Sequence, residues 1–115
     1  MSCKNVDART KPLPEAVELA LQRILAVHAP QKVILFGSWA WGDATSDSDL
    51  DFLIVTILEG SRHELAMKLL MKLVDLTLPK DIVVLTPEEW ELKRTLPGSI
   101  AYPADKEGIV LYEAA

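Results

Sequence analysis

Cysteine is almost absent from this 115-residue chain, because Cys3 is the only one and no internal disulfide can form. That usage fits a reducing compartment. Five glycines and seven prolines are too few for a low-complexity or disordered chain. No apolar run approaches the roughly 18 residues of a membrane span, and the first residues, MSCKNVDARTK, lack the apolar segment of a signal peptide. We therefore expect a soluble, cytoplasmic protein that makes no membrane contact.

Basic residues are also in the minority, with 12 Lys and Arg against 17 Asp and Glu and a formal net charge of −5. This balance argues against broad electrostatic binding to nucleic acid or to an anionic membrane, although it allows one small cationic pocket. Half of the residues are apolar and 25% are charged, as in a globular domain. A chain of this length buries about two-thirds of its unfolded surface, so it needs no metal or disulfide merely to fold.

The hydrophobic pattern predicts alternating helices and strands. An amphipathic helix runs from Pro14 until Pro30 closes it, and Thr86-Pro87 followed by Glu89 is typical of a capped helix start. The other expected elements are strands at 33–36, 49–58, 81–85 and 108–112, one helical turn within 37–48, a helix capped by Gly60-Ser61, and loops at Pro97-Gly98 and Pro103. This order predicts an α/β (α+β) fold, a small mixed β-sheet covered by helices, in one domain spanning 13–115 behind a flexible N-terminal arm at 1–12.

Two aspartates open one of the predicted strands. Asp49 and Asp51 head the run DLDFLIVTIL, and because strand side chains alternate, both point to one face with Cβ atoms about 7 Å apart. Leu50 and Phe52 point to the opposite face and can anchor a core. Carboxylates at this separation can bind two divalent cations about 4 Å apart, as two-metal phosphoryl chemistry requires. Carboxylate and phosphate oxygens are also the ligands typical of Mg²⁺.

A glycine–serine pair supplies the other half of a phosphate site. Gly37 and Ser38 follow the strand at 33–36, so the backbone can approach a phosphate, and amide groups and the Ser38 hydroxyl can donate to it. Asp81 begins another predicted strand. If that strand neighbours the one that starts at Asp49, Asp81 completes a triad and can act as general base toward an acceptor hydroxyl.

Gly37-Ser38, ten intervening residues and Asp49-x-Asp51 resemble the signature of the minimal nucleotidyltransferases, small members of the DNA polymerase β-like superfamily. The resemblance extends through DIVV at 81–84 and EGIVLYE near the end of the chain. It implies a polymerase β-like nucleotidyltransferase fold. It also implies that Asp49 and Asp51 bind Mg²⁺, that Asp81 completes the metal-binding and catalytic triad, and that Gly37 with Ser38 holds nucleotide phosphates.

The same resemblance implies Mg-dependent transfer of a nucleoside monophosphate, AMP from ATP, to a protein hydroxyl. Many family members pair with a helical HEPN-domain protein, and in some pairs the nucleotidyltransferase is an antitoxin that modifies a tyrosine of that partner. We therefore expect an antitoxin that modifies a HEPN toxin; the sequence leaves open whether the chain forms a homo-oligomer. Trp41 departs from the family pattern Gly-Ser-x-Ala-Arg-Gly, because it replaces the basic residue and removes a phosphate or structural contact.

Two other functions remain open. A catalytically weak binding module would neutralise a HEPN partner by direct contact, an alternative that the short chain and Trp41 favour. A metal-dependent phosphohydrolase or nuclease would use the same acids, although the acidic net charge and the Gly-Ser spacing argue against nucleic acid as substrate.

Other conspicuous residues have simpler interpretations. Asp47-x-Asp49-x-Asp51 resembles the start of a calcium loop, but Phe52 and Leu58 stand where that loop needs Gly and Glu. Asp75 competes with Asp81 as the third acid, but it is expected at a helix end rather than at the head of a strand. Lys93 and Arg94 are expected at a solvated helix end, with contact to triphosphate as the alternative. The remaining expectations are turns or caps for Asp43 and Asp47, surface positions for His28 and His63, the core or else a docking surface for Met67 and Met71, and packing of helix on sheet for Trp39 or Trp41.

Overall fold

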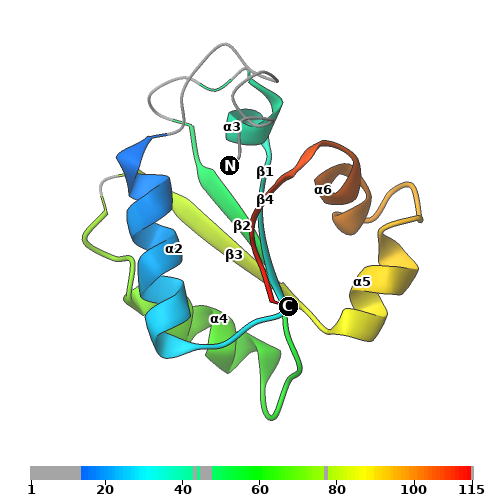
Figure 1. Cartoon of the computed structure of the whole chain (residues 1–115), viewed down its shortest axis with the longest axis horizontal. Helices are drawn as coiled ribbons and strands as arrows, with labels where there is room; N and C mark the ends of the chain where they lie inside the picture. Colours follow the sequence, from blue (N-terminus) through cyan, green and yellow to red (C-terminus); the bar gives the residue numbers. More distant parts are fainter. Residues whose placement is uncertain (1–13, 43, 45–47, 77, 115) are drawn as a thin grey trace.

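The computed structural model describes residues 14–42, 44, 48–76 and 78–114, coloured along the chain in Figure 1. The elements in chain order are α2 (Glu15–Val27), β1 (Lys32–Phe36), α3 (Ser38–Trp41), β2 (Leu50–Val55), α4 (Arg62–Met71), β3 (Lys80–Leu85), α5 (Pro87–Lys93), α6 (Ala101–Glu107) and β4 (Ile109–Glu113). The predicted arm at 1–12 and the turn roles predicted for Asp43 and Asp47 fall outside the described residues.

The four strands form one mixed sheet in the order β3-β2-β1-β4. β1 is antiparallel to both of its neighbours, whereas β2 and β3 are parallel. Two adjacent parallel strands need a crossover connection, and α4 lies between β2 and β3 in the chain. The predicted fold class, a mixed sheet with helices, is confirmed.

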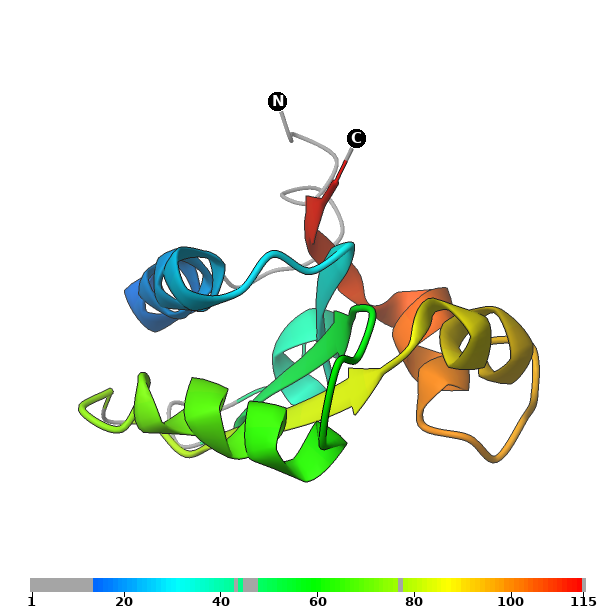
Figure 2. The ribbon, with the colours of Figure 1, turned by 90° about the horizontal axis from the view of Figure 1, so that it is seen from below.

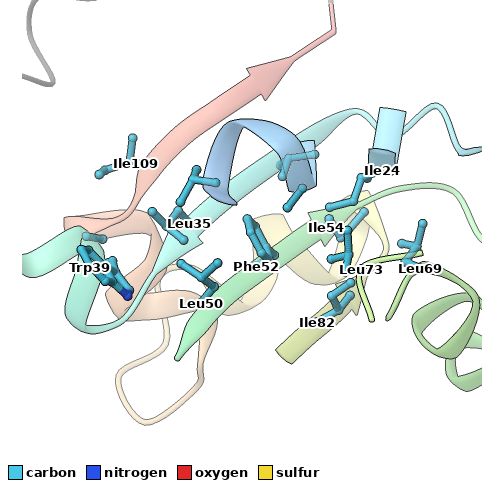
Figure 3. Packing of buried hydrophobic residues seen from close by; sticks show 14 of the residues in the cluster. Ile24, Leu35, Trp39, Leu50, Phe52, Ile54, Leu69, Leu73, Ile82 and Ile109 are labelled. Atoms are coloured by element: carbon cyan, nitrogen blue, oxygen red, sulfur yellow. The ribbon is translucent and has the colours of Figure 1, made fainter. Parts of the chain in front are cut away.

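Helices cover both faces of the sheet: α2 and α4 lie on one side, and α5 and α6 lie on the other (Figures 1 and 2). The buried side chains of the strands alternate between these two layers. Figure 3 shows the larger cluster, in which Leu50 and Phe52 of β2 pack with Ile24 of α2 and Leu69 of α4. The prediction that Leu50 and Phe52 anchor a core is therefore confirmed.

The smaller cluster occupies the opposite face of the sheet. There Leu53 and Val55, the residues of β2 that alternate with the first set, pack with Trp90 of α5 and Ala104 of α6. Both faces of β2 are thus buried over most of its length, which explains its continuous apolar run.

Two helices begin at the residues that the sequence predicts as caps. Ser61 caps α4, and its hydroxyl accepts a hydrogen bond from the third backbone N–H of the helix at 3.2 Å. Thr86 and Glu89 form a reciprocal capping box at α5, with distances of 3.1 Å and 2.9 Å, and Pro87 occupies the first helical position. These signals lie within the first turn of each helix, so the sequence can show where both helices start.

Several element boundaries differ from the prediction. Pro103 lies inside α6 rather than in a loop. It is the third residue of that helix, where the backbone N–H of any residue would lack an intrahelical acceptor, so proline is tolerated. Helix α2 ends at Val27, three residues before Pro30, and β2 ends at Val55 with Asp49 just before its first residue.

Two side-chain expectations change. The side chains of Met67 and Met71 are 44% and 64% exposed, so the core alternative is wrong and the docking-surface alternative stays a prediction, whereas Leu69 is fully buried. His28 is half-buried rather than on the surface, and its Nε2 lies 2.8 Å from the hydroxyl of Thr56. Among the described residues, no helix is both long enough and apolar enough to cross a membrane.

Candidate functional site

The end of β1 and the starts of β2 and β3 lie side by side at one end of the sheet, where α3 follows β1 (Figure 1). We call this end of the sheet, with Asp49, Asp51 and Asp81, the acidic edge. The register pairs Asp51 of β2 with Phe36, the last residue of β1, and with Asp81 of β3. Because β2 and β3 are parallel neighbours in register, Asp51 and Asp81 project from the same face. The condition that the sequence left open, adjacency of these two strands, is met.

Asp51 and Asp81 lie on the face of the sheet that α5 and α6 cover further along the strands, and we call it the acidic face. Asp51 alternates with Leu50 and Phe52, and it therefore shares a face with Leu53, whose side chain belongs to the smaller cluster. Asp51 is half-buried, whereas Asp49 and Asp81 are exposed. Asp51 therefore lies between solvent and the apolar packing behind it, and the charges of Asp49 and Asp81 are near enough to act on it.

Gly37 lies directly against the carboxylate of Asp51. Its backbone has φ 85° and ψ −157°, a region that is essentially restricted to glycine. A β-carbon at this position would lie 2.5 Å from Oδ2 of Asp51, too close for any real contact. The conformation requires glycine, and a β-carbon would in addition force the carboxylate of Asp51 to shift.

The single turn of α3 places its two tryptophans differently. The Gly37 carbonyl accepts hydrogen bonds from the amides of Ala40 and Trp41, both at 3.0 Å. Trp39 is 9% exposed and packs in the larger cluster, whereas Trp41 is 47% exposed. The prediction that at least one of them packs between helix and sheet is confirmed for Trp39.

Electrostatics at this edge disfavour negative charge on Asp51. Its pKa is raised above the usual range, first by burial and then by the neighbouring charges of Asp49 and Asp81. Oδ1 of Asp81 accepts a hydrogen bond from the backbone N–H of Ile82 at 3.0 Å. A divalent cation between these carboxylates would relieve the repulsion, since opposite charge stabilises the ionised form. Among the described residues, no three acidic, histidine or cysteine side chains form a group that could hold a metal ion as they stand.

Comparison with known families decides the assignment. The family model for the polymerase beta nucleotidyltransferases matches residues 20–115. The chain belongs to this nucleotidyltransferase family. No functionally curated protein matches the sequence significantly.

Solved structures share the fold. A candidate nucleotidyltransferase from Sulfolobus solfataricus is 20% identical, with a TM-score of 0.59 over 86% of this chain and 78% of that chain. A toxin–antitoxin structure with AMP-PNP is 22% identical, with a TM-score of 0.52 over 84% and 73% of the two chains. A candidate minimal nucleotidyltransferase is 26% identical, with a TM-score of 0.49 over 82% and 93%.

Other charged residues of this nucleotidyltransferase have partners away from the acidic edge. Asp75, the competing third acid, forms an ion pair with Arg23 of α2. Arg94 pairs with Glu91 at 3.2 Å and with Asp105 at 3.4 Å. Arg94 follows the last residue of α5, as predicted for a helix end, but it is half-buried rather than solvated, and Asp75 lies beyond the end of α4 at Met71. His63 is exposed as expected.

The nucleotidyltransferase also has a cavity of about 590 Å³ beyond the other end of β2, whose lining includes His28, Thr56, Ser61 and Lys68. None of the predicted site residues lines it. The sequence interpretation missed one contact at the acidic edge: Nε1 of Trp39 donates to the Ser48 carbonyl at 3.1 Å. A tryptophan directly after Gly37-Ser38 was the available signal.

Proposed function

We propose that this nucleotidyltransferase transfers AMP from ATP to a hydroxyl group of a protein. The observation that carries the proposal is the contact of Gly37 with the carboxylate of Asp51, because it puts the glycine–serine turn and the acidic face in one site. In this scheme Gly37 and Ser38 hold the β- and γ-phosphates, Asp49 and Asp51 hold Mg²⁺, and Asp81 completes the triad as general base.

The donor chemistry at this end of the sheet suits a magnesium ion. Asp51 is half-buried, and its pKa is raised first by burial and then by the charges of Asp49 and Asp81. Oxygen donors of this type are those that Mg²⁺ takes when it is shared with a triphosphate. When bound there, the metal would neutralise the charge of the triphosphate and of the departing pyrophosphate.

The transfer step uses the exposed carboxylate of Asp81, which lies on the edge strand β3 where an acceptor can approach. The acceptor oxygen bonds to the α-phosphorus while the bond from that phosphorus to the bridging oxygen of pyrophosphate breaks. The hydroxyl proton passes to Asp81, and pyrophosphate departs from the Gly37-Ser38 turn.

The acceptor is assigned by analogy to a HEPN-domain toxin, which makes the chain a cytoplasmic antitoxin. Support comes from the resemblance to the minimal nucleotidyltransferases and from the shared fold with a toxin–antitoxin structure that contains AMP-PNP. Exposed apolar side chains on α4, Met67 and Met71, are available for such a contact.

Label transfer from α-labelled ATP to a co-expressed HEPN partner, in the presence of Mg²⁺, tests the proposal. Asp51→Asn removes one charge without changing side-chain volume, so transfer should be abolished while the fold persists. Asp75→Asn, at the competing acid, is the matched control and should retain transfer. Full transfer by the Asp51→Asn variant would refute the metal assignment.

A second function, neutralisation by binding alone, is favoured by Trp41, which stands exposed where the family pattern has arginine. Calorimetry separates the two. Binding of Mg-ATP by the isolated chain supports the enzyme, whereas tight binding to the HEPN partner without any nucleotide affinity supports the binding module.

A further inference from the structure

Trp39 connects the two halves of the proposed site. It follows Ser38 directly in the chain, and its indole N–H donates to the carbonyl of Ser48, the residue before Asp49, at 3.1 Å. We propose that Trp39 is a positioning residue that sets the place of Asp49 relative to the phosphate-holding turn, and thereby the affinity for the divalent cation. The inference rests on the proposed function, because that function assigns Asp49 to the metal.

The indole is a fixed donor. Trp39 is 9% exposed and belongs to the larger cluster together with Leu50 (Figure 3). A large aromatic ring packed on a sheet cannot swing without leaving a cavity, and a buried tryptophan N–H needs an acceptor. The hydrogen bond therefore fixes Ser48, in the segment that leads into β2, relative to α3.

Asp49 depends on this hydrogen bond for its position because it lies outside the hydrogen-bonded strand pairing of β2. β2 begins at Leu50, and the backbone N–H of Leu50 donates to the Pro79 carbonyl at 2.8 Å. The Ser48 carbonyl on one side of Asp49 is held by Trp39, and the Leu50 amide on the other side is held by the chain leading into β3. These two bonds clamp the backbone of an exposed residue that strand pairing does not reach.

Trp39→Phe tests the clamp, because it keeps an aromatic ring in the core but removes the donor. Trp90→Phe is the matched control: Trp90 is 4% exposed and packs in the cluster on the opposite face. A second variant carries benzothienylalanine at position 39, which preserves the ring shape and replaces the N–H by sulfur. It keeps the test decisive if phenylalanine at this position prevents folding.

The first measurement is Mn²⁺ binding by electron paramagnetic resonance in the presence of a non-hydrolysable ATP analogue. Loss of one hydrogen bond should weaken Mn²⁺ binding about three- to tenfold in both position-39 variants, with no change in the Trp90→Phe variant. Unchanged Mn²⁺ binding in the benzothienylalanine variant, or equal weakening in the control, would overturn the inference.

The second measurement needs neither metal nor nucleotide. Amide hydrogen exchange at Leu50 should accelerate in the position-39 variants, while exchange at Leu53 in the middle of β2 stays slow. An unchanged rate at Leu50 would also overturn the inference. If the unaltered protein binds no Mn²⁺, the proposed function fails, and the exchange at Leu50 alone decides whether Trp39 holds this segment.

Discussion

The α-carbon of Gly37 lies against the carboxylate of Asp51, so closely that a β-carbon there would be 2.5 Å from Oδ2. The two residues are 14 positions apart in the chain, and the antiparallel pairing of β1 with β2 brings them together. The turn proposed to hold phosphate and the acid proposed to bind metal are therefore in contact. Any side chain at position 37 must displace the acid or the turn.

Gly37→Ala should lower the free energy of unfolding by about 1–3 kcal/mol, because the backbone conformation is one that only glycine adopts readily. It should also abolish nucleotide transfer, since the new methyl group displaces Asp51. Chemical denaturation and the label-transfer assay measure the two effects.

Two other glycines separate the effect of the backbone conformation from the effect of the contact with Asp51. Gly98 has φ 99° with open space around it, so Gly98→Ala should show the conformational cost without loss of transfer. Gly60 has open space and no positive φ, so Gly60→Ala should change neither quantity. Full activity in the Gly37→Ala variant would show that the close approach is unimportant for catalysis.

Asp51→Asn should stabilise the metal-free protein by up to about 1 kcal/mol, since partly exposed charges interact weakly. The pKa of Asp51 is raised above 3.8 in the folded state, so the folded protein binds its proton more tightly than the unfolded chain does. The stability that this proton contributes is fully present below pH 3.8 and is lost as pH rises through the raised pKa. The advantage of the Asp51→Asn variant over the unaltered protein should therefore grow with pH across that window.

Thermal melting across pH checks this expectation, and added Mg²⁺ should stabilise the unaltered protein but not the Asp51→Asn variant. The Asp75→Asn variant serves as control, because that carboxylate pairs with Arg23 and should lose stability when neutralised. A metal-free Asp51→Asn variant that is less stable than the unaltered protein at neutral pH would contradict the electrostatic account.

The contribution of Glu89 to the free energy of unfolding should change with pH in the direction opposite to that of Asp51. The guanidinium of Arg62 donates to both of its carboxylate oxygens at 2.7 Å and 2.8 Å, and the Thr86 amide donates to one of them. Together these bonds lower the pKa of Glu89 from 4.5 to about 2. The stability that they add is present above pH 4.5 and is lost as pH falls through about 2.

Replacing the carboxylate tests this contribution. Glu89→Gln should lower the free energy of unfolding at pH 7 by up to about 1 kcal/mol and should flatten its dependence on acid pH. Glu88→Gln, at an exposed neighbour in the same helix turn, should leave both unchanged. Identical acid titrations of stability for the two variants would argue against the Arg62 contact.

Trp41→Arg should strengthen triphosphate binding. The side chain is 47% exposed and lies one helical turn after Ser38, so a guanidinium there would reach the phosphates. We expect KM for ATP to fall severalfold, with an effect that shrinks at high salt. Leu92→Arg, at a 64% exposed position on α5, adds the same charge elsewhere and should not change KM. Equal KM values for all three proteins would remove phosphate contact as the role of position 41.

Local chemistry made much of the fold predictable. The capping box of Thr86 and Glu89 and the cap at Ser61 depend only on residues within one turn, so the sequence indicates them directly. The local signal at Pro103 predicts a loop, because proline breaks the interior of a helix, but Pro103 lies in the first turn of α6, where proline is tolerated. Local chemistry left the choice between core and surface open for Met67 and Met71, because an apolar stripe does not reveal how much of a helix another layer will cover.

The sequence by itself determined that Gly37-Ser38 breaks a buried strand and that Asp51 opposes Leu50 and Phe52, because chain alternation and glycine conformation are local properties. Only the tertiary structure decided that β3 pairs with β2 in the register that aligns Asp81 with Asp51, and that Trp39 reaches the Ser48 carbonyl. Strand order and register depend on which apolar faces α4, α5 and α6 bury together, and that choice is made by packing over the whole chain.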